Sequence, residues 1–489
     1  MIVNRNHFID TQQDSTGFEN LQADFESADD LAFPYLVQEI AEQLDLGMWG
    51  PLIFRPIHYL GSKLRALRSI LTEIDKLDPQ RGRVADLFAG SGAVSAALSM
   101  QRDVTAVDVQ EYSRVLCSSL LGLSWFSAEA ANQFEHKVRN SPLLEKLLHC
   151  LEPLITLEQR CIRDALCGRA EGICDVIQSG SIFLRESNAA KQSSDDLQFA
   201  LDETFNRLAR EGLTGSHRTT VSRYFGGIYF SYLQSVQLDA ALDCVDDERR
   251  KSKDAFLAAI LSTASTVVNT IGKQFAQPIM PIDGSGAPKR HLIRQIEEDR
   301  SQPVIDTLGK WLRRYASLPR HSGEHSVIRG DYPIIERQKN IAIVYADPPY
   351  TRDHYSRYYH VLETMCRRDN PELSKVPGPS GAVSRGMYRV DRHQSPFCIK
   401  TQAAGAFEKL FALVRNLNVP LLLSYSPYPS DREARPRLMT VMDLTELSRK
   451  YFRHVDLISV GGIVHNKLNT TSLNFAAPEQ AEILLSCRP

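Results

Sequence analysis

One short stretch combines residue types that could do chemistry together: Asp347, Pro348, Pro349 and Tyr350. The apolar run at 341–345 just before it has the length of a buried strand in a parallel sheet. Ligands of open α/β sheets bind beyond the carboxyl ends of the strands, where this group would lie. Consecutive prolines lack N–H groups and hold φ near one value, so their carbonyls are fixed acceptors. The stretch therefore offers a carboxylate, a free carbonyl and an aromatic ring side by side.

Such a set of groups suits an exocyclic amine on a flat heterocycle. Two acceptors on its N–H groups would polarise the amine towards the geometry needed for attack, and the ring of Tyr350 could stack on the base. The stretch resembles the Asp/Asn-Pro-Pro-Tyr/Phe signature of the amino-methyltransferases. That resemblance implies methylation of adenine N6 or cytosine N4.

A second stretch, residues 84–95, has the pattern of a short strand, a glycine-rich turn and the start of a helix. Its candidate binding residues are Asp86, Phe88, Ala89, Gly90 and Gly92. The glycines allow close approach of a ligand to the backbone, and the helix N-terminus offers free N–H groups. The next strand ends in Asp108, about 20 residues further on, where an acid can bind ribose hydroxyls.

The chemistry of this turn favours S-adenosylmethionine over a dinucleotide. The third glycine of the dinucleotide pattern is missing, and Asp86 at the start of the turn is a poor neighbour for phosphates but a good one for a cation. S-adenosylmethionine carries an ammonium group, a carboxylate and a ribose. The phosphate-binding Gly-x-x-x-x-Gly-Lys-Ser/Thr loop of an ATP motor is absent.

The bulk composition is that of an ordinary globular protein. The 489 residues are 43% hydrophobic and 24% charged, enough for two or three domains. The nine cysteines form no Cys-x-x-Cys pair, so we expect reduced thiols and no metal site. With no signal peptide and no apolar run long enough for a membrane, we expect a cytoplasmic protein.

Charge is distributed unevenly along the chain. Residues 1–50 hold ten acidic residues against the single base Arg5, whereas the whole chain has a net charge of −2. We interpret 1–50 as an acidic, solvated N-terminal extension. The remainder is mildly basic, which is compatible with a phosphate-bearing partner.

Between about 127 and 320 the pattern changes to one helix after another, which predicts an insertion between two halves of the sheet. The aromatic stretch 223–232 within it is interpreted as core packing. The loop 284–290, with Lys289 and Arg290, favours phosphate contact. The sheet then resumes at 326–331, a strand that ends in Asp331.

A Pro/Gly/Ser-rich segment at 370–400 follows the Asp-Pro-Pro-Tyr stretch and carries further basic residues. Among them, Arg385 and Arg389 are additional candidates for nucleic-acid contact.

In their order along the chain, these pieces resemble the Dam-like (D12-class) N6-adenine-specific DNA methyltransferases. That family begins with a Tyr/Trp-x-Gly-x-Lys segment, which here is Tyr59 to Lys63. The glycine-rich turn, an acidic strand end, a target-recognition insertion and Asp-Pro-Pro-Tyr follow. The resemblance covers about 50–125 and 325–487, whereas the insertion matches only in position.

The resemblance implies a fold, a domain plan and a role for each motif. We expect an α/β, Rossmann-like methyltransferase sheet with helices on both faces, interrupted by a large, mainly helical insertion. The expected parts are 1–50, an acidic extension; 51–126 and 325–489, the catalytic domain; and 127–324, the target-recognition insertion. Tyr59, Lys63, Phe88 and Gly90 would line the methionine end of S-adenosylmethionine, with Asp108 on the ribose and Asp331 on the adenine. Asp347 and the Pro348 carbonyl would hold the target N6, and Tyr350 would stack on the flipped base.

The implied activity is in-line methyl transfer to adenine N6 in DNA, without a metal. The implied setting is a bacterial or phage-encoded restriction-modification or defence system, with a separate restriction endonuclease or other subunit as partner. Three alternatives remain: N6 methylation of adenine in RNA, N4 methylation of cytosine in DNA, and a non-catalytic nucleic-acid-binding subunit of a modification complex.

Overall fold

The computed structural model describes residues 54–61, 63–187, 193–319, 323–352, 354–376, 382–426, 438–461 and 480–489. The acidic extension predicted at 1–50, as well as Ser62, lies outside these residues. No helix in the described ranges is long and apolar enough to cross a membrane.

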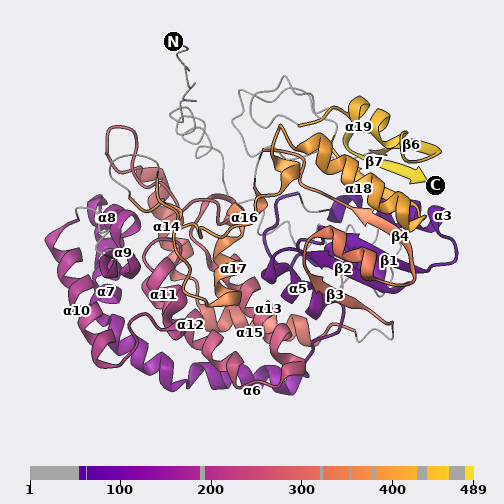
Figure 1. Cartoon of the computed structure of the whole chain (residues 1–489). Coiled ribbons are helices and arrows are strands. Elements are labelled where there is room, and N and C mark those ends of the chain that lie inside the picture. The colour runs from indigo at the N-terminus through magenta and orange to yellow at the C-terminus, as the bar shows by residue number, and fades with distance from the viewer. Residues whose placement is uncertain are drawn as a thin grey trace, which may run out of the picture.

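The described strands form one seven-stranded sheet in the order β3-β2-β1-β4-β5-β7-β6 (Figure 1). The strands are β1 Arg83–Leu87, β2 Val104–Asp108, β3 Ser326–Arg329, β4 Ile341–Ala346, β5 Leu421–Tyr425, β6 His454–Gly461 and β7 Gln480–Arg488. The five neighbouring strands β3, β2, β1, β4 and β5 are mutually parallel. Strand β7 lies between β5 and β6 and is antiparallel to both. The order reverses between β1 and β4, so the carboxyl ends of these strands flank the crevice where α/β sheets bind ligands.

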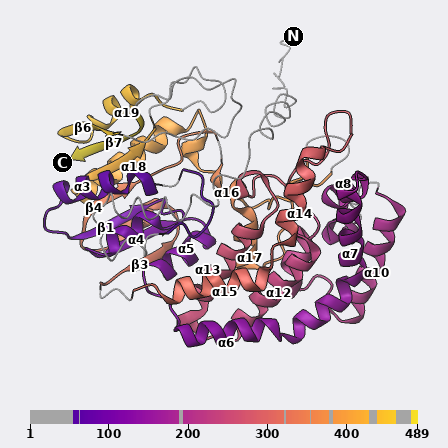
Figure 2. The same cartoon turned by 180° about the vertical axis from the view of Figure 1, so that it is seen from behind.

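Helices cover both faces of the sheet (Figures 1 and 2). Side chains alternate along a strand, and on β1 Val84 faces one apolar layer while Ala85 faces another. The first layer is completed by α3 Leu67–Leu77, α4 Ala93–Ser99 and part of α5 Glu111–Leu120. The second is completed by α18 Ala403–Leu417 and α19 Val441–Ser448. The expected α/β sheet with helices is therefore present.

Only helices and loops lie between β2 and β3 after α5 in the described chain. They are α6 Ala128–Arg139, α7 Pro142–Leu166, α8 Glu171–Ser179, α9 Ile182–Glu186, α10 Asp195–Arg210, α11 Thr220–Phe225, α12 Tyr232–Asp246, α13 Arg250–Val267, α14 Ile293–Ser301 and α15 Val304–Ala316. Two more, α16 Tyr355–Tyr358 and α17 His360–Arg367, follow β4. The 3₁₀ turns are η3 Leu64–Ala66, η4 His217–Thr219, η5 Ile271–Lys273, η6 Arg290–Leu292, η7 Tyr332–Arg337 and η8 Pro396–Cys398.

Local sequence accounts for several of these helices. Helix α7 begins with Pro142 at its first position, where the missing N–H costs nothing. Helix α12 begins with a capping box in which the Ser231 and Gln234 side chains each bond the other's backbone N–H. Helix α15 buries Ile305, Leu308 and Leu312 on one face, as the apolar spacing requires.

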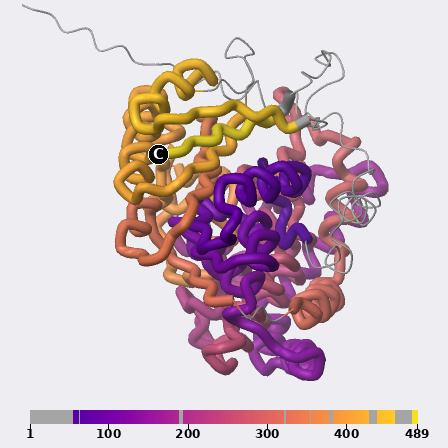
Figure 3. The backbone as a smooth tube through the Cα atoms, turned by 90° about the vertical axis from the view of Figure 1, so that its right-hand side faces the viewer, coloured from indigo at the N-terminus to yellow at the C-terminus, as the bar shows by residue number. Residues whose placement is uncertain are grey.

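One continuous apolar core joins the helices, with α5 as the link to the sheet. Helix α5 packs on β2 and β3 and also on α13 and α17. The aromatic stretch 223–232 lies inside this core, where Tyr229, Phe230 and Tyr232 are fully buried. Its interpretation as core packing is confirmed. In Figure 3 the indigo segment that contains α3 lies against the yellow strand β7, from the opposite end of the chain.

Candidate active site

A pocket opens at the carboxyl ends of β1, β2 and β4, where the reversal of strand order leaves a crevice. The predicted site residues that line it are Tyr59, Phe88, Asp108, Asp331, Asp347, Pro348 and Pro349. These residues come from segments that are more than two hundred positions apart in the sequence. Register explains the convergence, because Leu87 at the end of β1 pairs with both Val107 and Ala346. Lys63, Asp86, Ala89, Gly90, Gly92 and Tyr350 are not part of this lining.

The glycine-rich turn after β1 has a left-handed backbone at three positions: φ is 64° at Phe88, 56° at Gly90 and 79° at Gly92. Gly92 caps the N-terminus of α4. A Cβ atom on Gly90 would lie 2.4 Å from the Tyr59 hydroxyl oxygen. Only glycine therefore allows the Tyr59 ring to lie on this turn.

We expect Gly90→Ala to lower the free energy of unfolding by about 1–3 kcal/mol, because the left-handed φ and the clash with Tyr59 act together. A urea titration measures this. Gly405→Ala is the matched control, since Gly405 is in α18 with nothing within 4 Å of its added Cβ, and it should be neutral or slightly stabilising. Equal stability of the two variants would contradict the account of the turn.

Asp108 fixes the edge of the pocket next to this turn. Its two carboxylate oxygens accept the N–H groups of Gly90 and Gln110, each at 2.9 Å. Burial raises the pKa of Asp108 above its ordinary value, and the two backbone donors oppose this rise. A carboxylate has about four acceptor sites, so the residue can still accept bonds from a ligand.

Asp86 lies beneath the turn. It is fully buried and accepts a hydrogen bond of 2.5 Å from the Ser95 hydroxyl on α4. Burial raises the pKa of Asp86 to about 7, although the Ser95 bond lowers it. The residue therefore ties the turn to α4, and the backbone of Ala89 is likewise held by the Val107 carbonyl at 3.1 Å.

Asp331 follows β3, is exposed and lines the pocket. Its carboxylate accepts the Tyr332 N–H at 2.8 Å at the start of η7. The Phe397 ring in the 370–400 segment packs edge-on against the Phe88 ring, with centroids 5.4 Å apart. His393 and Ser395 of the same segment line the pocket. Sequence reasoning gave these residues no role.

An aromatic wall, made of Tyr59, Tyr355 and Tyr359, borders the pocket. The Tyr59 ring stacks on Tyr359 with centroids 4.9 Å apart and planes 12° from parallel, and the Leu60 N–H donates to the Tyr359 hydroxyl at 2.7 Å. Tyr355 lines the pocket beside them. The sequence signal for this wall is the run of tyrosines that follows Asp-Pro-Pro-Tyr.

Asp347 is held by a buried lysine. The Lys63 ammonium lies 2.9 Å from Asp347 Oδ2 and 3.4 Å from Glu482 Oε1, and only 7% of the Lys63 side chain is exposed. Burial raises the pKa of Asp347 above its ordinary value, while Lys63 lowers it and Glu482 raises it. The structure thus places Lys63 on the carboxylate of Asp347 and not in the pocket lining. Glu482 was not among the predicted residues.

The other residues of the Asp347–Tyr350 tetrad differ in their environments. Pro348 and Pro349 line the pocket, whereas Tyr350 is largely buried and packs on Tyr425 with ring centroids 5.0 Å apart. The Lys63 ammonium lies 5.8 Å from the centre of the Tyr350 ring.

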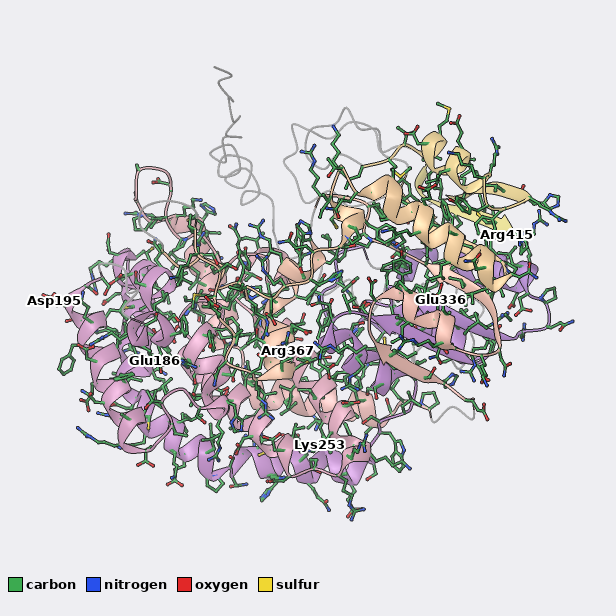
Figure 4. The ribbon with its side chains drawn as sticks, viewed as in Figure 1. Glu186, Asp195, Lys253, Glu336, Arg367 and Arg415 are labelled. Atoms are coloured by element: carbon green, nitrogen blue, oxygen red, sulfur yellow. The ribbon has the colours of Figure 1, made fainter. Side chains whose placement is uncertain are left out.

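The four predicted basic contacts fall into two groups. Arg290 is exposed and Lys289 is half-buried, on the loop before α14. The Arg385 guanidinium instead donates to the Pro278 carbonyl at 3.1 Å, and Arg389 is fully buried in ion pairs with Asp369 and Asp391. Arg389 is occupied inside the protein, so the structure does not present it for nucleic acid, whereas Arg385 is half-buried like Lys289. Arg367, labelled in Figure 4, pairs with the same two aspartates where the helices adjoin the sheet.

No group of three or more His, Cys, Asp or Glu side chains in the described ranges is arranged to hold a metal ion.

Comparison with known proteins agrees with the geometry. Residues 59–143 match the model of a family described as D12 class N6 adenine-specific DNA methyltransferase. The match runs from Tyr59 through the glycine-rich turn and Asp108, and so confirms the predicted resemblance to this class.

One curated relative matches most of this chain. Modification methylase LlaI of Lactococcus lactis subsp. lactis is 26% identical over 421 residues, which cover 84% of this chain and 50% of the relative. The chain therefore spans about half the length of the curated relative that it matches.

Proposed function

We propose that this protein transfers a methyl group from S-adenosylmethionine to the N6 amino group of adenine in DNA. The observation that carries the proposal is one pocket that Asp347, Pro348, Asp108 and Asp331 line together. The two acceptors that we propose for the target amine and the two carboxylates that we propose for the cofactor nucleoside thus line one cavity. The match to the D12 class and the similarity to a modification methylase support the same reaction.

The pocket fits S-adenosylmethionine by the chemistry of its donors and acceptors. Asp108 can accept ribose hydroxyls, Asp331 can accept the adenine amino group, and the Phe88 ring offers an apolar surface. Gly90 leaves room for the Tyr59 ring that closes one side. The strand order β3-β2-β1-β4-β5 supports a Rossmann-like arrangement for this domain.

S-adenosylmethionine supplies a methyl group on a sulfonium. As the nitrogen–carbon bond forms, the carbon–sulfur bond breaks and the sulfur keeps its electron pair. The protein's task is then to position and polarise the target amine. We propose that Asp347 accepts one N–H and the Pro348 carbonyl the other. N6 loses one proton in the exchange, and Asp347, whose pKa is raised by burial, is placed to take it. A duplex would have to flip its base, at a cost of a few kcal/mol.

We propose that residues 127–324 recognise the target, while 51–126 and 325–489 carry the catalytic site. The segment after the tetrad packs on the helical core through Leu362, Met365 and Leu373. This packing supports a direct connection between the helical insertion and the segment that follows the tetrad. Lys289 and Arg290 are the basic residues that we propose for DNA contact. We propose a restriction endonuclease as the partner, because a modification enzyme would protect DNA against cleavage by such a nuclease.

We expect Asp108→Ala to raise the dissociation constant for S-adenosylmethionine about 100-fold, because bonds to a charged acceptor contribute about 1.5–3 kcal/mol each. Isothermal titration calorimetry measures this directly. Asp103→Ala is the control, since Asp103 pairs with Arg83 outside the pocket. A variant with lost turnover but unchanged affinity would contradict the ribose role.

Nucleoside mass spectrometry of DNA and RNA after incubation with S-adenosylmethionine tests the proposal. Wild type should produce N6-methyladenine in DNA, and Asp347→Ala should not. The same mark in RNA alone, or N4-methylcytosine, would overturn the substrate while keeping the chemistry. No mark on either polymer, with S-adenosylmethionine still bound, would favour a non-catalytic subunit.

A further inference from the structure

A polar cluster lies on one face of the sheet, next to the apolar layer under α3 and α4. Because side chains alternate along strands, the cluster continues the rows that begin with the apolar residues of that layer. Its members on β1, β4, β5 and β7 are Asp86, Tyr345, Ser424 and Glu482. All four are buried. Asp347 meets this cluster through Lys63.

Within the cluster one ammonium serves two carboxylates. The Lys63 ammonium lies close to three oxygens: it pairs with Asp347 Oδ2 at 2.9 Å and with Glu482 Oε1 at 3.4 Å, and it donates to the Gly61 carbonyl at 3.4 Å. The Ser424 hydroxyl donates to the same Glu482 oxygen at 2.7 Å. Glu482 is therefore held by both Lys63 and Ser424, and it is not part of the pocket lining.

We propose that Glu482 is a positioning residue for methyl transfer, which holds Lys63 so that Asp347 keeps one oxygen and part of its negative charge for the target amine. This inference rests on the proposed function. Without Glu482, the ammonium would be free to move fully onto Asp347 and to compete for both of its oxygens. An acceptor neutralised by a buried lysine polarises an N–H group less than a carboxylate that shares the lysine with a second one.

Other ionisable groups also face Asp347 and must be considered in its titration. They are Asp86 on β1, Tyr345 on β4, Tyr355 on α16, and Tyr59 and Lys63 before η3, while Tyr350 after β4 interacts with Lys63. The Tyr345 hydroxyl is buried without a hydrogen-bond partner in the described part of the chain. A substitution at 482 leaves all of these residues in place, so a shift seen on that substitution reports the lost charge of Glu482 and the move of Lys63 that follows from it.

Glu482→Gln removes the charge but keeps an oxygen that can accept the Ser424 hydroxyl. We expect the single-turnover methylation rate to fall about 10-fold, within the range of one proton-transfer or polarising group. The dissociation constant for S-adenosylmethionine should stay within about twofold, because Glu482 is outside the pocket lining.

The acid limb of the pH–rate profile should also move to lower pH. Asp347 must be ionised to accept the amine, burial and the Glu482 charge both raise its pKa, and loss of that charge lowers it. A merely structural role would lower stability without moving the acid limb.

Two further variants complete the experiment. Ser424→Ala removes the hydroxyl but keeps the charge, so its acid limb should match that of wild type. Glu482→Asp keeps the charge and should restore most of the rate, which guards against a Gln variant that folds poorly. Active wild type with an unchanged rate and profile in Glu482→Gln would overturn this inference alone. Wild type that marks no adenine would overturn the proposed function together with it.

Discussion

Asp347→Ala is expected to lower the methyl-transfer rate at least about 10³-fold, while the dissociation constant for S-adenosylmethionine stays within about twofold. The carboxylate would be lost from the one position where the target amine meets both an ionised acceptor and the fixed Pro348 carbonyl. The cofactor contacts proposed for Asp108 and Asp331 are untouched. Single-turnover kinetics and calorimetry separate these two effects.

The variant should nevertheless fold, and the structure says why. Two carboxylates share Lys63, so removal of Asp347 leaves Lys63 and Glu482 as a neutral buried pair. Asp456→Ala is the matched control, because Asp456 is on the same sheet but is exposed and pairs with Arg488. Equal rates for the two variants would remove Asp347 from the mechanism.

The parts of the site that depend on residues close together in the sequence could be predicted. The apolar strand before Asp347, the left-handed turn at Gly90 and the acid that ends β2 each depend on neighbours a few residues away. Parallel strands then bring their carboxyl ends to one edge, which is why three distant motifs meet in one pocket.

Partners supplied by distant strands could not be predicted in the same way. Glu482 reaches Lys63 only because β7 inserts antiparallel beside β5, and nothing in residues 480–489 marks a carboxylate that faces inward. Lys63 was assigned to the cofactor by motif, and the structure adds that its ammonium pairs with Asp347 and Glu482.

The burial of basic residues could not be predicted either, because it also depends on distant partners. Arg389 and Arg290 look alike in sequence as candidates for phosphate contact. Arg389 is buried because Asp369 and Asp391 flank it in space, whereas Arg290 is exposed at the start of η6. Burial of a charge depends on the partners that the fold brings to it, and only one of those partners is a close neighbour in sequence.

Lys63→Met is expected to cause a large loss of stability, whereas Asp347→Ala mainly lowers the methyl-transfer rate. Burial alone would lower the pKa of Lys63, but Asp347 and Glu482 raise it well above its usual range, so the ammonium stays charged. Its removal leaves two buried carboxylates without their cation, at a cost of about 3–5 kcal/mol in free energy of unfolding. Urea titration at neutral pH measures this cost. Lys76→Met is the control, because the exposed Lys76–Glu73 pair should contribute no more than about 1 kcal/mol.

The sign of the pH dependence distinguishes this cause from a simple packing defect. In Lys63→Met, Asp347 would keep the burial that raises its pKa and would lose the cation that lowers it, so the folded state would bind more protons than the unfolded state. Stability relative to wild type should therefore recover as the pH falls from about 8 to about 5, and be lost again as it rises. A deficit that is constant across this range would instead indicate lost packing of the lysine stem, and would argue against the shared charge on which both Asp347 and Glu482 depend.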